Sequence, residues 1–330
     1  MRRTLLTLAL VLALAPPAHA AWSFQLGIGE QGTAMFGDPR FAALDVKLVR
    51  VVTAWDVGCR AGPERDGFDN WLAAAREAGS RPLVAFSFSW AHGSRWRLPS
   101  YGTYLRCFRA FRKRYPGVRD FNPWNEANHS SQPTYRHPKK AAGFYNAMKR
   151  VCPRRCNVAA GDVLDWNHMV RWVQRYRRYL RGKPRLWSMH NYLDVNRPRP
   201  WRRSVTRRLL RITHGRLWIT ETAGVVRSRR YTGYDEERAA GATRRMLAFA
   251  RRAPRIKRVY AYQWQASCNA RAWDSGWFRS DGEARPAYRV IVRALARERK
   301  LDAAEVAALD PPLTPATRTW CTHTARAAVP

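Results

Sequence analysis

Short apolar segments alternate with helical patterns along most of the chain, and this alternation restricts the fold more than any other feature. Each apolar segment is apolar on both faces and rich in β-branched or aromatic residues, as expected of parallel strands that are buried on both sides. Eight segments have this character: residues 22–29, 46–55, 82–90, 118–126, 156–163, 185–192, 216–222 and 258–264.

Helical patterns separate most of these segments. In residues 67–79 the apolar side chains of Phe68, Trp71 and Leu72 recur on one face, and Gly79 is a natural stop. Similar patterns occupy residues 104–115, 167–180, 234–252 and 286–300. Eight strands that alternate with helices predict an α/β fold, specifically a (β/α)8 TIM barrel formed by a single catalytic domain.

A doubly wound open sheet is the alternative fold. It is disfavoured because the glycine-rich stretch "LGIGEQG" has the wrong spacing for a dinucleotide-binding loop and opens no clear helix. We therefore expect no cofactor.

The first 20 residues read as a secretory signal peptide. Arg2 and Arg3 precede an apolar run, which ends at Ala18-His19-Ala20, a small-residue cleavage site. The run is shorter than the roughly 20 residues that span a bilayer. We expect a secreted or periplasmic protein without a membrane span, a barrel over residues 21–300 and an irregular C-terminal extension over residues 301–330.

Six cysteines in an exported chain favour disulfide bonds. The local pair Cys152–Cys156 has the most support, and Cys59–Cys107 and Cys268–Cys321 are guesses among the pairings that six cysteines allow. A zinc site at Cys152 and Cys156 lacks a second pair of ligands at suitable spacing. We expect no bound metal.

The net charge of +36 is extreme. Such a charge favours nucleic acid, anionic membranes or acidic polymers as partners. Arginine is spread over helices and loops alike, however, which suits a general preference for arginine as well as a dedicated binding patch. The charge therefore leaves open whether the substrate is anionic, and it predicts no specific nucleic-acid site.

Two glutamates follow apolar strands at matching places. Glu126 ends the fourth predicted strand and Glu221 ends the seventh. The catalytic groups of such a barrel lie at the carboxyl ends of its strands, so both side chains can point into the same opening. Two facing carboxylates are the machinery of glycoside hydrolysis, in which one donates a proton and the other attacks the anomeric carbon.

The motifs around these glutamates resemble those of a known family. "WNEAN" after the fourth strand and "ITETAG" after the seventh are similar to the signatures of clan A retaining glycoside hydrolases, nearest to families 39 and 5. The resemblance extends to about Tyr288 and includes "SDGEARPAY" at residues 280–288. It implies that Glu126 is the acid/base and Glu221 the nucleophile.

Five further residues match the family's pattern and are predicted to bind substrate or support the nucleophile. Asn125 corresponds to the asparagine that hydrogen-bonds the sugar 2-hydroxyl, and Arg50 to the arginine that steadies the nucleophile. His190 and Tyr192 lie where the family has a hydrogen-bond donor to the nucleophile. Trp264 corresponds to the aromatic floor of the −1 sugar site.

One position departs from the pattern, because the family usually has proline after the acid and here the residue is Ala127. The loop is therefore expected to turn differently. Trp90 and His92, after the third strand, are possible subsite residues without a strong match, and Trp273 can line the substrate groove or merely pack.

Three functions remain open from the sequence. The first is an exported, monomeric retaining glycosidase that acts on a poly- or oligosaccharide, which is anionic if the net charge serves the substrate. The second is a carbohydrate-binding protein that has lost turnover. The third is a binder of nucleic acid or anionic surfaces driven by charge, whose affinity falls steeply with salt.

Overall fold

The computed structural model describes residues 22–152, 154–228, 233–266 and 273–311. Within them, nine parallel strands form one sheet in the order β5-β4-β3-β2-β1-β9-β8-β7-β6. The strands are β1 (Gln25–Gly29), β2 (Leu48–Ala54), β3 (Arg81–Ser87), β4 (Asp120–Asn122), β5 (Asn157–Val158), β6 (Ala160–Leu164), β7 (Leu186–His190), β8 (Arg216–Thr222) and β9 (Ile256–Tyr262).

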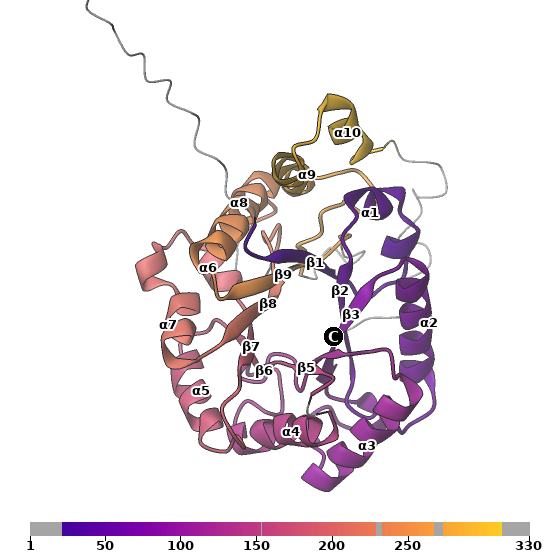
Figure 1. The fold of residues 1–330 in the computed structure, drawn as a ribbon, viewed down its shortest axis with the longest axis vertical. Helices are drawn as coiled ribbons and strands as arrows, with labels where there is room; N and C mark the ends of the chain where they lie inside the picture. The colour runs from indigo at the N-terminus through magenta and orange to yellow at the C-terminus, as the bar shows by residue number, and fades with distance from the viewer. Residues whose placement is uncertain (1–21, 153, 229–232, 267–272, 312–330) are drawn as a thin grey trace, which may run out of the picture.

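The sheet curls into a nearly closed barrel (Figure 1). The two edge strands, β5 and β6, are separated along the chain by Ala159 alone, so they are two halves of one segment that pairs with β4 on one side and β7 on the other. Counted this way, all eight predicted strands are present, and the predicted (β/α)8 barrel is confirmed.

Helices surround the barrel (Figure 1). They are α1 (Pro39–Leu44), α2 (Pro63–Glu77), α3 (Tyr101–Arg114), α4 (Pro138–Val151), α5 (Met169–Arg177), α6 (Tyr192–Asn196), α7 (Val205–Ile212), α8 (Glu236–Arg252), α9 (Pro286–Arg299) and α10 (Ala303–Ala308), with the short 3-10 helices η1 (Ala34–Gly37), η2 (Trp90–His92) and η3 (Trp201–Arg203). The five predicted helices correspond to α2, α3, α5, α8 and α9.

Helix α4 was not predicted although it belongs to the main ring. It buries Ala141, Phe144, Tyr145 and Met148, which recur at helical spacing, and it begins with Pro138 at a position that favours helix starts. In the predicted C-terminal extension the structure places the short helix α10, whose first turn is fixed by a capping box between Asp302 and Glu305.

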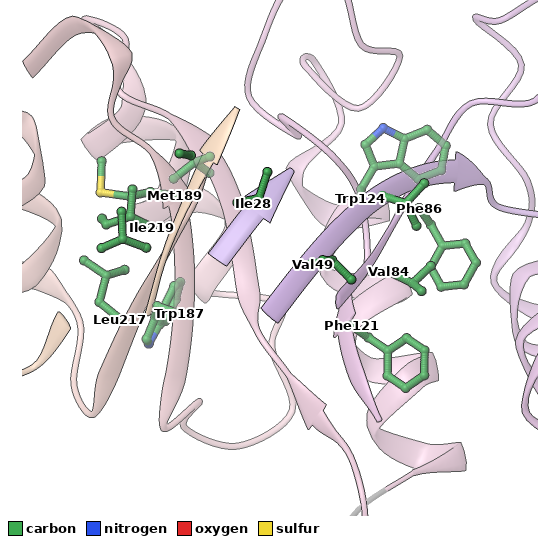
Figure 2. Close-up of a cluster of buried hydrophobic side chains, with 14 of the residues drawn as sticks. Ile28, Val49, Val84, Phe86, Phe121, Trp124, Trp187, Met189, Leu217 and Ile219 are labelled. Atoms are coloured by element: carbon green, nitrogen blue, oxygen red, sulfur yellow. The ribbon is translucent and has the colours of Figure 1, made fainter. Parts of the chain in front are cut away.

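Side chains alternate between two layers along the strands. Val49, Phe86, Trp187 and Ile219 point away from the barrel axis and belong to the large core that includes the helices (Figure 2). A second, separate cluster fills the interior of the barrel toward the amino ends of the strands. It consists of Leu48, Leu83, Ala159, Leu186, Trp218 and Tyr260. The interior is therefore a packed core, with a group of polar residues around Arg50 toward the carboxyl ends of the strands and a buried ion pair between Asp120 and Arg258 toward the amino ends.

Two of the three predicted disulfides, Cys59–Cys107 and Cys152–Cys156, are present. The third, Cys268–Cys321, lies outside the described residues, as does the predicted signal peptide. The two disulfide bonds fit an oxidising, extracellular environment. Among the residues that the structure describes, none of the helices has both the length and the apolar character needed to cross a bilayer.

We expect the two disulfides to contribute unequally to stability, because they close loops of very different length. Cys59 and Cys107 are separated by 48 residues, whereas Cys152 and Cys156 are separated by 4. The chain-entropy estimate gives about 4 kcal/mol for the long loop and about 2 kcal/mol for the short one. Denaturant unfolding of the two double Cys→Ser variants measures this, and equal losses would contradict it.

Candidate active site

The residues singled out from the two glutamate motifs gather at the carboxyl end of the barrel. Arg50 lies in β2, Glu126 in the turn after β4, His190 at the end of β7 and Glu221 in β8. Tyr192, which was predicted as a strand residue, opens the short helix α6 instead. These segments are far apart in sequence, and the parallel order of the strands brings their ends together.

Arg50 is the central cation of this group. Its side chain is 1% exposed. One guanidinium nitrogen donates to Glu221 Oε1, and the other donates to Asn125 Oδ1 at 2.7 Å and to Asp162 Oδ2 at 3.3 Å. Burial alone lowers the pKa of Arg50, but the charges of Glu221 and Asp162 outweigh it and raise the pKa. The guanidinium therefore stays charged and fixes the positions of three acceptors.

Glu126 lies four residues beyond the end of β4, not at the end of the strand as predicted. Its backbone is left-handed, with φ of 46°, a conformation that is uncommon for residues other than glycine and often marks functional sites. The next residue, Ala127, uses its N–H to donate to the Asp162 carbonyl at 3.2 Å. Proline could neither make this bond nor follow such a backbone easily, which explains the departure from the family's pattern.

Glu221 reaches the barrel interior because the ladder is irregular around it. Register shifts occur between Met189 and His190 on the β7 side and between Ile219 and Thr222 on the β8–β9 side. A bulge of this kind inserts an extra residue and re-aims the following side chain. Thr220 and Glu221 can therefore both face the site: Thr220 Oγ1 donates to Asp162 Oδ1 at 2.5 Å, while Glu221 contacts Arg50.

A second backbone irregularity turns the side chain of Asp162 toward the site. This residue was not predicted from the sequence. The register of β6 shifts between Gly161 and Val163, and Asp162 has φ of 52°. Its fully buried carboxylate lies 3.3 Å from Arg50 Nη2 and 3.5 Å from His190 Nε2. Burial raises the pKa of Asp162, but the charges of His190 and Arg50 outweigh it, so the pKa is lowered. An aspartate in an apolar strand was the signal available in the sequence.

His190 lies between the two glutamates and is fully buried. Its Nδ1 is 3.2 Å from Glu126 Oε1 and 3.4 Å from Glu221 Oε2. Burial lowers its pKa, but the charges of Glu221 and Asp162 and the hydrogen bonds to Asp162 and Glu126 raise it to about 10. His190 therefore carries a proton on the nitrogen that faces both glutamates at neutral pH.

The same contact determines the state of Glu126, whose side chain is 19% exposed. Burial raises the pKa of this carboxyl, yet the hydrogen bond and charge of His190 outweigh burial and hold the pKa below its ordinary value. The sequence analysis expected a protonated acid here. The raised pKa of His190 and the lowered pKa of Glu126 assign the proton to His190 instead.

Glu221 also accepts a hydrogen bond from the Tyr192 hydroxyl at 3.1 Å. Burial raises the pKa of Tyr192 well above its usual value, and the charge of Glu221 raises it further, so the phenol remains a donor. The predicted neighbours of Glu221 thus all lie within reach of its carboxylate or of Arg50.

Glu126, His190 and Glu221 each offer one atom within 4.8 Å of the others, which is close enough to hold a metal ion. A cation there would have to displace the proton of His190 and would lie next to the Arg50 guanidinium. Both conditions oppose the binding of a metal ion, so we interpret the cluster as two carboxylates that are bridged by the protonated His190 ring.

The structure contradicts the assignment of Trp264 as a sugar platform. Strand β9 ends at Tyr262, and the Trp264 ring is 0% exposed and packed against Phe41 and Phe278. Its indole N–H points to Asp38 Oδ2 at 3.3 Å. A ring enclosed on both faces cannot stack on a sugar.

Tyr262 and Trp273 are better placed as aromatic neighbours of the site. Trp273 packs edge-on against Tyr192 at 5.1 Å between ring centroids. Tyr262 and Trp273 are only partly buried, whereas Tyr192 is buried. Burial raises the pKa of Tyr262, and the charge of Glu221 raises it further, which places its phenol in the field of that carboxylate. Period-two alternation from Tyr260 in the eighth predicted strand could have identified Tyr262.

A pocket of about 330 Å³ lies at the opposite end of the barrel, among the first residues of several strands. Its lining includes Arg216, Lys257 and Arg258 but no carboxylate. Two-carboxylate chemistry therefore belongs to the end that carries Glu126 and Glu221.

No family model matches the sequence, and a search of curated proteins finds no match. Solved structures do resemble the chain. GH5_18 from Streptomyces cattleya in complex with GlcNAc is 18% identical, with a TM-score of 0.59 over 86% of this chain and 82% of that one. Xylanase 10B from Thermotoga petrophila in complex with xylobiose is 12% identical, with a TM-score of 0.59 over 85% and 95%.

A β-glucosidase from Thermotoga maritima is more distant, at 9% identity and a TM-score of 0.53 over 83% of this chain and 98% of that one. Likeness at these identities establishes the shared barrel fold. The neighbours include GH5 enzymes, whereas a specific relation to families 39 and 5 remains a prediction from the sequence motifs.

The raised pKa of His190 predicts that stability falls at alkaline pH. Below about pH 6.5 both the folded and the unfolded chain carry the proton. Between 6.5 and about 10 only the folded state keeps it, so the free energy of unfolding decreases as pH rises through this window. Thermal unfolding of wild type and His190→Gln across pH 6–10 checks this. Identical slopes would contradict it.

We predict that Asp162 helps to keep His190 protonated. In Asp162→Asn the ring loses a charge and a hydrogen bond that raise its pKa, so the pKa should fall below about 10. NMR titration of the His190 ring measures the shift. Asp120→Asn, which removes a buried carboxylate that pairs with Arg258 at the other end of the barrel, is the control and should leave the titration unchanged.

Proposed function

We propose that the protein is a retaining glycoside hydrolase in which Glu221 is the nucleophile and Glu126 the acid/base. The observation that carries the proposal is the short distance between the two glutamates. One carboxylate oxygen of Glu126 and one of Glu221 lie within 4.8 Å of each other. Retaining enzymes hold their carboxyl groups about 5–5.5 Å apart, and inverting enzymes about 6.5–9.5 Å apart to admit a water molecule. The spacing favours attack by Glu221 itself.

The contacts of Glu221 suit this role. Arg50 and Tyr192 occupy its two oxygens with donors, so the carboxylate is oriented before substrate arrives. Asn125 accepts from Arg50 through Oδ1, which leaves its amide N–H₂ to donate to a sugar hydroxyl beside Glu221.

Proton transfer in this proposal uses the pair of Glu126 and His190. His190 Nδ1, which carries the proton, lies 3.2 Å from Glu126 Oε1, within hydrogen-bond reach. When Glu221 forms the glycosyl ester, it loses the negative charge that helps to keep His190 protonated. In the first step His190 passes its proton to Glu126, which protonates the leaving oxygen. In the second step Glu126 takes a proton from the attacking water and returns it to His190.

The second candidate is a carbohydrate-binding protein without turnover. The observation that favours it is the lowered pKa of Glu126, which is the opposite of what a resting general acid requires. Asp162, His190 and Arg50 argue for catalysis instead, since binding alone needs no buried network around a pair of carboxylates.

The substrate class is a poly- or oligosaccharide, and the charge of +36 favours an anionic one. Export fits the predicted signal peptide and the two disulfides. We propose that the exported protein acts as a monomer. Hydrolysis rates on uronic-acid polymers and on neutral xylan or mannan, compared at low and high salt, test the charge. Equal and salt-independent rates would exclude an anionic preference.

The covalent intermediate gives the most direct test. Incubation with 2-deoxy-2-fluoro glycosides of several sugars should label Glu221, which intact mass and peptide mapping detect. Glu221→Ala should remain unlabelled. A label on another residue, or labelling that persists in the variant, would disprove the assignment of the nucleophile.

Substitution of each glutamate should have a different signature. Glu221→Ala is expected to lose turnover by about 10⁴-fold or more, and azide should restore it with inversion of the product. Glu126→Ala should lose most on substrates with poor leaving groups and little on activated aryl glycosides, because only the former need protonation. Wild-type rates in both variants would contradict the mechanism.

A further inference from the structure

We propose that the loops after β2 and β3 form a separate sugar subsite, which binds one neutral, hydroxyl-bearing ring of the glycan. The inference rests on the proposed function. Both loops lie at the carboxyl end of the barrel, the end that carries Glu126 and Glu221. Between them is an open pocket of about 320 Å³, lined among others by Asp56, Glu64 and Trp90.

Trp90 supplies the stacking surface. It is 51% exposed, although most tryptophans of the described chain are largely buried. Its backbone N–H lies 3.4 Å from Glu64 Oε1, and the adjacent Ser89 hydroxyl donates to Glu64 Oε2 at 3.2 Å. These contacts tie the start of η2 to the first turn of α2. The indole is therefore held at the pocket without being covered, as a platform for the apolar face of a sugar requires.

Asp56 supplies the polar recognition. It is 2% exposed, and its Oδ2 contacts His92 Nε2 at 2.9 Å and Arg60 Nε at 3.6 Å. Its Oδ1 is buried and has no hydrogen-bond partner among the described residues. A buried carboxylate oxygen without a donor is costly, and a ligand hydroxyl that donates to it removes that cost.

The remaining charges define the class of ring. The lining holds two carboxylates, Asp56 and Glu64, and two guanidinium groups, Arg60 and Arg65, so it is balanced in charge. An acidic sugar would place its carboxylate against the Asp56 oxygen, which can only accept. The pocket therefore selects a neutral ring even if other units of the glycan are anionic.

Three contacts fix the position of the wall that carries Asp56. The disulfide Cys59–Cys107 ties this loop to α3. Gly58 lies so close to α3 that a side-chain carbon there would meet the Phe111 backbone N at 2.5 Å. Trp55 stacks on His92, the partner of Asp56, at 5.3 Å between ring centroids. Little ordering is needed on binding, which favours affinity.

The test uses neutral xylo-, manno-, cello- and chitooligosaccharides of two to six units as probes, with affinity measured by calorimetry. A series that is hydrolysed during the measurement is repeated in the Glu126→Gln background. Trp90→Ala should weaken binding of the best series about ten-fold or more. Trp96→Ala is the matched control, because Trp96 is 52% exposed in the same loop but does not line the pocket.

Two further measurements address the same contact. Asp56→Asn keeps the shape of the side chain and should weaken oligosaccharide binding, whereas Trp96→Ala should leave the affinity unchanged. In ¹⁵N NMR spectra, the indole N–H signal of Trp90 is identified as the one that is absent from the spectrum of Trp90→Ala. This signal should shift when the oligosaccharide that binds best is added to the wild-type protein. Equal affinities for wild type and Trp90→Ala, a loss shared with Trp96→Ala, or no binding by any series would overturn the subsite.

The outcome separates the subsite from the proposed function. Labelling of Glu221 by a 2-deoxy-2-fluoro glycoside together with unaltered binding in Trp90→Ala would leave the glycosidase and remove the subsite. Trp90-dependent binding without any label or hydrolysis would keep the subsite on a binding protein. Preference for acidic over neutral oligosaccharides at this pocket would contradict the argument from Asp56.

Discussion

The buried guanidinium of Arg50 is the interaction on which the rest of the site depends. A cation in the interior of a barrel is tolerated only with close anionic partners. Arg50 has Glu221 on one guanidinium nitrogen, and Asp162 and the Asn125 amide oxygen on the other. Asp162 in turn contacts His190, which lies between Glu126 and Glu221. Asp162 and Glu221 thus compensate one buried charge, and Glu126 is linked to them through His190.

Backbone irregularities make this network possible. In a regular strand, neighbouring side chains point to opposite faces of the sheet. Without an irregularity in β6 and in β8, two adjoining residues of the same strand could not both point into the barrel. The register shifts around Asp162 and Glu221 turn these carboxylates toward His190, on the intervening strand β7. Left-handed backbone at Glu126 and Asp162 belongs to the same region. Irregular, strained geometry is therefore concentrated where the proposed chemistry takes place.

Prediction from the sequence succeeded where the signal is local. All eight strands and five helices follow from apolar periodicity, and the two glutamates follow from their places after apolar strands. Helix α4 was missed although Phe144 and Met148 recur at helical spacing. Trp264 was assigned wrongly because the end of β9 was placed too far along the chain. The strand ends at Tyr262, and the Trp264 ring beyond it packs against Phe41 of α1 and against Phe278.

The sequence by itself determined the barrel, the local disulfide and the residues around which a site could form, because strand and helix periodicity and side-chain chemistry act over short stretches. Tertiary structure decided which of these residues meet. The partnership of Arg50 with Asp162, the proton on His190 and the pocket beside Trp90 and Asp56 join segments separated by tens to more than a hundred residues. Their geometry depends on register shifts and on burial, which no local pattern encodes.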